Sequence, residues 1–244
     1  MRRLFVALII LTALTPAVFA SIASAADMPV KAPIPKAAKL PYDWGGLYLG
    51  GHIGYLWGRT RVEEDGDVTE PNAPTNGAIG GVMAGYNWQS GRVVFGLEGD
   101  FGWTNAHGTG NVAPPPPIII TTQAPNTYDV NWTAHIRGRT GYAFDNWLLF
   151  IAGGFAVADF EFHEGAITTV VLPPPGGKYY GWSIGGGAEV AITRNLIGRV
   201  EYLYDDFGHK DYIGVTGDPY RVSFRAQTVR GALAWKFDPF GMRP

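Results

Sequence analysis

Apolar and polar residues alternate along much of the chain. Within residues 47–58, every second residue is mostly bulky and apolar, and the residues between them are mostly small or polar. A period of two is typical of a β-strand whose two faces meet different surroundings. The alternation recurs in seven further segments and predicts eight strands in all. The further segments are residues 78–89, 93–104, 131–142, 147–160, 182–192, 199–205 and 229–237.

The connections between these segments alternate in length. Short turns are expected around residues 90–91, 145–146 and 194–195, and long segments near 59–76, 105–129, 161–178 and 206–221. Short turns on one rim and long loops on the other are typical of bacterial outer-membrane barrels, whose turns face the periplasm. The pattern predicts an all-β fold, an eight-stranded antiparallel transmembrane β-barrel with short periplasmic turns and four long extracellular loops. Which face of 147–160 points inward stays open, because both contain bulky residues.

The tryptophans test whether the barrel lies in lipid. Indole rings favour the two headgroup levels of a membrane, where they form aromatic girdles. The alternative is a soluble barrel such as a lipocalin, whose lumen would have to hold rings that here lie at strand ends. The predicted girdles are Trp44, Trp88, Trp147 and Trp235 at the periplasmic rim, and Trp57, Trp103, Trp132 and Trp182 at the extracellular rim.

The two ends of the chain differ in composition from the predicted barrel. Arg2 and Arg3 precede an apolar run too short to span a bilayer, and Ala23-Ser24-Ala25 fits a signal-peptidase site. A retained anchor is the alternative, which Pro16 disfavours. The expected parts are a signal peptide (1–25), a Pro/Lys-rich periplasmic extension (26–44), an outer-membrane β-barrel (45–237) and a C-terminal periplasmic tail (238–244).

Composition narrows the possible functions. Charged residues make up 16% of the chain, whereas about 25% is usual in soluble domains. The absence of Cys excludes disulfides, Cys-ligated metals and thiol nucleophiles. With 19 basic against 21 acidic residues, no basic excess supports nucleic-acid binding.

The inward face of the predicted strands carries a balanced set of charges. An eight-stranded barrel has room for its own side chains and little else. Because an unpaired buried charge costs several kcal/mol, we expect the charges to pair and to plug the lumen. A selective channel is the alternative. The predicted network is Glu98, Asp100, Glu189, Glu201, Arg137, Arg139, Arg199 and Arg230, with Asp205 and Lys236 near opposite rims.

Several stretches resemble a known family. Residues 26–33 (ADMPVKAP) and 42–55 (YDWGGLYLGGHIGY) resemble the start of the small alphaproteobacterial outer-membrane immunogenic or porin-family proteins, relatives of the opacity-type barrels. Residues 80–89 and 229–237 resemble the second and last strands of that family. The resemblance implies a surface antigen of the cell outer membrane. It also implies that Trp235 and Phe237 form the signal read by the barrel-assembly machinery, although residues 238–244 follow them.

The sequence gives catalytic and metal-binding motifs little support. No His-Glu-x-x-His occurs, and the one Gly-x-Ser-x-Gly string, residues 181–185, lies at the start of a predicted strand with no helix pattern after it, so we predict no enzyme, no catalytic residue, no metal and no cofactor. A rim enzyme using His209 and Asp211 is the nearest alternative. His107 and His163 lie with His209 in three long loops, and their convergence on a divalent metal or haem iron is a further alternative to three solvated side chains.

Together these features predict a structural, surface-exposed barrel of the cell envelope, with a plugged lumen and displayed loops. A narrow porin for small solutes is the alternative function. The expected partners are outer-membrane lipid and the barrel-assembly machinery, with host or surface ligands at the loops and no nucleic acid. Two proline-containing runs in the loops, residues 114–120 and 168–175, are the candidate adhesive segments.

Overall fold

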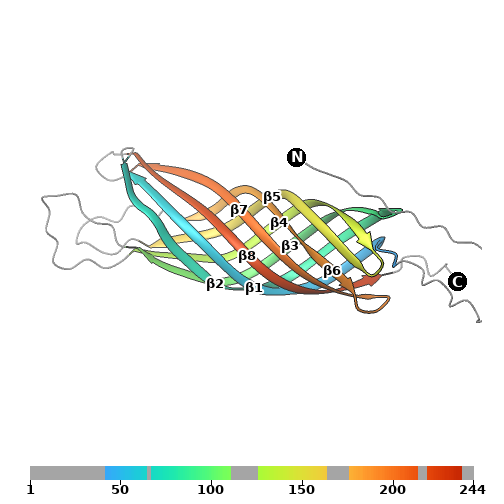
Figure 1. The fold of residues 1–244 in the computed structure, drawn as a ribbon. Coiled ribbons are helices and arrows are strands. Elements are labelled where there is room, and N and C mark those ends of the chain that lie inside the picture. The colour runs from blue at the N-terminus through green and yellow to red at the C-terminus, as the bar shows by residue number, and fades with distance from the viewer. Residues whose placement is uncertain (1–41, 65–66, 111–125, 164–175, 214–218, 238–244) are drawn as a thin grey trace, which may run out of the picture. The chain divides into compact units, whose positions relative to one another are not determined.

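Eight antiparallel strands close into a barrel (Figure 1), as the alternation predicts. The computed structural model describes residues 42–64, 67–110, 126–163, 176–213 and 219–237. Each strand pairs with its neighbour in the chain, and β8 pairs with β1 to close the sheet. The strands are β1 (Gly46–Glu64), β2 (Asp67–Ser90), β3 (Val93–Gly110), β4 (Asn126–Phe144), β5 (Trp147–His163), β6 (Gly177–Ala191), β7 (Leu196–Ile213) and β8 (Pro219–Phe237).

The strands are longer than the alternation predicts. They contain between 15 and 24 residues, whereas about 9–11 suffice to cross a bilayer. Pairing between β1 and β2 continues to Glu64 and Asp67, and each segment expected to be a long connection begins or ends as paired strand. Outside the membrane the outward face of a strand meets water, while inward side chains such as Val62 and Phe207 stay buried. Lipid no longer requires apolar residues on the outward face there, so the alternation seen in the membrane part ends while the backbone ladder continues.

Some predicted features fall outside the described residues. These are the signal peptide (1–25), most of the Pro/Lys-rich extension (26–44), the tail (238–244) and the two proline-containing runs (114–120 and 168–175).

The two faces of the wall have opposite character. Large apolar side chains point outward, including Ile53, 74% exposed, and Ile136, 63% exposed, while charged side chains are enclosed. A soluble barrel would reverse this arrangement. On β5, Leu148 and Phe150 point inward, which settles the face that the alternation left open. No helix among the described residues is long and apolar enough to cross a membrane.

Seven of the eight girdle tryptophans lie on the outer face, as predicted for rings in contact with lipid. Trp44 does not, and its assignment to the periplasmic girdle is wrong. Its side chain is fully buried at the end of the lumen, edge-on to Tyr42 at 4.8 Å between ring centroids. The physical reason is that Trp44 precedes β1 at an even number of residues before Tyr48, so its side chain points to the same inward side. Its backbone N–H also donates to the Gln89 side chain at 2.6 Å.

Candidate functional site

The eight charged residues predicted to face inward all lie inside the barrel, and none is more than 8% exposed. Residues two apart on a strand share a face, so β3, β4 and β7 each supply a consecutive inward pair. The set comprises Glu98 and Asp100 from β3, Arg137 and Arg139 from β4, Glu189 from β6, Arg199 and Glu201 from β7, and Arg230 from β8. The structure brings all eight into one network of ion pairs.

Arg137 lies at the centre of this lumen network. Its Nη1 donates to Glu201 Oε1 at 2.8 Å. Its Nη2 donates to Glu98 Oε1 at 2.9 Å and to Asp100 Oδ2 at 3.1 Å. One guanidinium thus joins three carboxylates, a geometry that its planar fork of donors permits and a lysine ammonium does not reproduce.

The other three arginines complete the network. Arg139 and Arg199 share Glu189 Oε1, at 2.8 Å from Nη2 of Arg139 and 2.6 Å from Nε of Arg199. Arg230 donates to Asp100 Oδ1 at 2.8 Å and to Glu201 Oε2 at 2.9 Å. Each arginine therefore contacts at least two carboxylates. Such sharing offsets the large cost of taking charges out of water.

Three further residues belong to the network: Tyr48 and His135, which the charge pattern did not select, and Asp205, which it placed near a rim. The Tyr48 hydroxyl donates to Glu98 Oε2 at 2.5 Å and accepts from Arg139 at 3.0 Å. His135 lies between Asp100, 2.9 Å from its Nδ1, and Asp205, 3.4 Å from its Nε2. Asp205 is buried there and not at the rim. The alternation places these residues on the inward face, but it does not identify their partners. Asp100 lies opposite His135 on the neighbouring strand, whereas the contacts of Tyr48 with Glu98 and of His135 with Asp205 join strands that are not neighbours.

Small residues make room for the network. Gly54 on β1 faces inward beside Arg230, where an added Cβ would lie only 2.7 Å from the Arg230 Cβ. Gly85 on β2 faces the Tyr48 phenol, and a Cβ there would overlap the hydroxyl. The glycine excess of the sequence thus has a partial explanation, because inward glycines let large polar side chains cross a narrow lumen.

Apolar side chains close the lumen on both sides of the charges. Towards the short turns, Trp44, Met83, Leu148 and Ile197 form one buried cluster with Tyr48. Lys236 lies at this end, where its ammonium donates to the backbone carbonyl of Asp43. Towards the long connections, a second cluster contains stacked and tilted rings, with Phe224 5.1 Å from Phe160 and 5.4 Å from Phe207. That cluster is Leu56, Val62, Ala73, Ile79, Ala106, Tyr128, Val130, Ala156, Ala158, Phe160, Tyr179, Phe207, Val222, Phe224 and Ala226.

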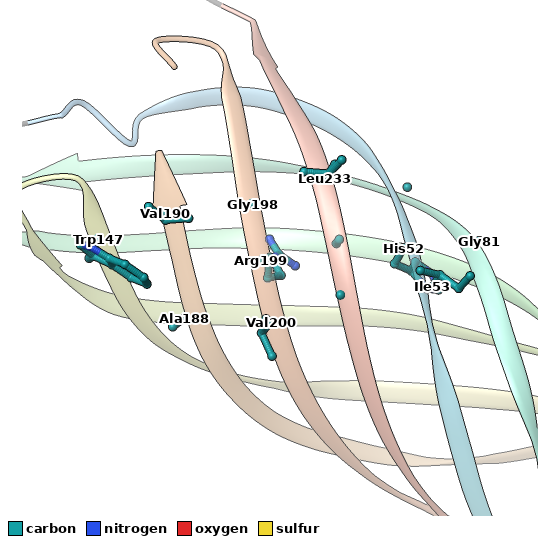
Figure 2. A pocket seen from close by; sticks show the side chains of 13 residues that line it. His52, Ile53, Gly81, Trp147, Ala188, Val190, Gly198, Arg199, Val200 and Leu233 are labelled. Carbon is teal, nitrogen blue, oxygen red and sulfur yellow. The ribbon is translucent and has the colours of Figure 1, made fainter. Parts of the chain in front are cut away.

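A shallow groove crosses the outer wall, and Figure 2 shows its labelled lining residues. Outward-facing Gly198 and Gly231 leave the gap, and Ile53, Val200 and Leu233 flank it. These flanking side chains are apolar, so the groove offers apolar contact to surrounding lipid.

The loop histidines do not gather in the part of the chain that the structure describes. His107 contacts Asp129 at 2.6 Å at the β3–β4 edge, and His209 lies exposed on β7. The His163 side chain lies outside the described residues. No group of three His, Asp or Glu that suits a metal ion occurs among the described residues. Asp211, the suggested partner of His209, instead binds Arg221 at 2.7 Å.

Comparison with known proteins gives consistent relatives. A family model described as "Outer membrane protein beta-barrel domain" matches residues 12–237. The 25 kDa outer-membrane immunogenic protein of Brucella abortus is 28% identical over 97% of this chain and 100% of that protein. The 31 kDa outer-membrane immunogenic protein of Brucella melitensis is 31% identical over 91% of this chain and 96% of that protein. The crystal structure of OprG from Pseudomonas aeruginosa aligns with a TM-score of 0.49 at 9% identity, over 79% of this chain and 97% of that one.

Proposed function

The chain belongs to the outer membrane protein β-barrel family and resides in the cell outer membrane, and we propose that it is a structural envelope protein with a sealed lumen. Its long connections are then displayed at the cell surface. The observation that carries the proposal is the burial of Arg137, which has no exposed surface although it lies at the centre of the lumen.

A conducting pore would need water in contact with the charged residues that line it. Here the inward charges are bonded to one another, and Glu189 and Arg137 are both at 0% exposure. The apolar clusters on either side add two further barriers. This arrangement supports a plug over the alternative, a narrow porin for small solutes. The same pairing supports a non-catalytic role, because the buried carboxylates and guanidiniums are bound to one another.

Planar-bilayer recordings of the refolded protein test the proposal. We expect no steady conductance from the wild-type barrel. The test variant is Arg137→Ala, and the matched control is Arg221→Ala, which removes an arginine from an exposed pair outside the lumen. Reproducible single-channel steps in the wild type that change in Arg137→Ala and not in Arg221→Ala would establish conduction through the lumen and overturn the plug.

A further inference from the structure

Two arginines face each other on the outer wall, just beyond the extracellular aromatic girdle. Arg59 on β1 and Arg225 on β8 are cross-strand partners, and both point outward. Arg61 follows on the same face of β1, and its side chain is 53% exposed. Like charges directly opposite each other in a sheet are destabilising. The arrangement therefore calls for an anion nearby.

The neighbouring carboxylates neutralise only part of this charge. Asp206 binds Arg225 at 2.9 Å, and Glu63 binds Arg61 at 2.9 Å. The sheet neighbours of Arg59 are Pro74 and Arg225 across the strands, and Trp57 and Arg61 along its own strand. Among the described residues, no ion pair includes Arg59. Its sheet neighbours thus include two arginines and no described carboxylate.

The position of these arginines in the membrane identifies the class of anion. Arg59 is one outward position beyond Trp57, or about 7 Å further along the strand. Trp57 is 44% exposed and belongs to the predicted extracellular girdle, where rings lie at headgroup level. Guanidinium groups at that level meet the phosphates of lipid headgroups, which they bind with two parallel hydrogen bonds.

We propose that Arg59 and Arg225, assisted by Arg61, bind a phosphate group of an outer-leaflet lipid. The ligand bridges β1 and β8, the pair of strands that closes the barrel. It neutralises the facing guanidiniums and holds the closing seam from outside. This site is separate from the lumen network and does not depend on whether the lumen conducts.

The chain supplies a matched control for the site. Arg221 is also an outward arginine of β8, but its side chain binds Asp211 at 2.7 Å. Its cross-strand partner on β1 is Glu63 in place of another arginine. Arg221 is therefore neutralised by the protein itself, and removing it should leave lipid binding unchanged.

Native mass spectrometry of the refolded protein in detergent tests the site, with bisphosphorylated lipid A as the probe. We expect one tightly retained lipid, about tenfold weaker binding in the double variant Arg59→Gln/Arg225→Gln, and wild-type binding in Arg221→Gln. Lipid A stripped of both phosphates should bind as weakly to the wild type as intact lipid binds to the double variant. Equal retention of intact lipid A by wild type and double variant would overturn the proposal.

Two further measurements test the source of the phosphate and the geometry of its binding. Inorganic phosphate at the lipid concentration should not displace lipid A, and if it does, the site recognises free phosphate and the lipid assignment is wrong. Arg59→Lys/Arg225→Lys keeps the charge but loses the planar fork, so its affinity should lie between those of the wild type and the glutamine variant. Full wild-type affinity in the lysine variant would contradict bidentate binding. Heat-modifiable migration in SDS gels checks that each variant is folded.

Discussion

Replacing Arg137 by alanine removes the central cation of the lumen network. Arg137 has no exposed surface, and it contacts Glu201 at 2.8 Å, Glu98 at 2.9 Å and Asp100 at 3.1 Å. Removing one partner of a buried ion pair typically costs about 3–5 kcal/mol, because the remaining charge stays buried. We therefore expect a large loss of stability from this single change.

The ion pairs that remain in Arg137→Ala determine where in that range the loss of unfolding free energy falls. Glu98 keeps Arg199 at 2.7 Å. Asp100 and Glu201 keep Arg230 at 2.8 and 2.9 Å. Because each carboxylate retains a second guanidinium, the loss should fall at the lower end, about 3 kcal/mol. That corresponds to roughly a 150-fold change in the unfolding equilibrium constant.

Urea unfolding of the refolded barrel in detergent micelles, followed by tryptophan fluorescence, measures this loss. The matched control is Arg221→Ala, which removes one partner of an exposed pair with Asp211 and should leave the unfolding midpoint unchanged. Exposed pairs contribute little because water and salt screen them. If Arg137→Ala unfolds at the same urea concentration as Arg221→Ala, the lumen network does not stabilise the barrel and the reasoning fails.

Three other changes test further features. Trp44→Ala should lower the free energy of unfolding by about 3–5 kcal/mol, because the ring is fully buried. An unchanged urea midpoint would mean that the ring lies on the outer face, as a girdle residue. Gly85→Ala should lower the refolding yield, because its Cβ would overlap a phenol hydroxyl, whereas Gly138→Ala should refold normally, since its Cβ would come no closer than 4.0 Å to another group. Phe237→Ala should reduce the amount of protein in the outer-membrane fraction, and deletion of residues 238–244 should not; equal loss from both would make the tail part of the assembly signal.

The lumen charges could be located from sequence because one local rule determines their side of the wall. Arg137 and Arg139 are two residues apart, on the strand face opposite to Ile136 and Tyr142, so both must face inward if those apolar side chains face lipid. Their partners could not be paired in the same way. Which carboxylate meets Arg137 across the barrel depends on strand tilt and stagger, and these are properties of the closed sheet. The contact between Arg137 and Glu201, 64 residues apart, is of this kind.

The apolar and polar alternation could not assign a face where its assumption, an apolar outward face and a polar inward face, does not hold. On β5 the inward residues include Leu148 and Phe150, which are as apolar as the outward ones because they pack against the lumen clusters and the arginine side chains. Hydrophobicity alone does not separate the two faces there. Trp44 lies before the first strand, and its assignment to the girdle rested on its residue type alone. Its position is even, like those of the inward residues of β1, and its side chain is buried accordingly.

The two faces of the wall together specify the strand register. A slip of β4 by one residue turns every side chain to the opposite face, which would move Arg137 and Arg139 into lipid and Ile136 into the lumen. An arginine facing the bilayer midplane costs about 2–4 kcal/mol, and the carboxylates left behind would lose their partners. The slipped barrel is thus penalised twice for each displaced arginine. The network therefore selects one barrel among the possible pairings, in addition to closing its lumen.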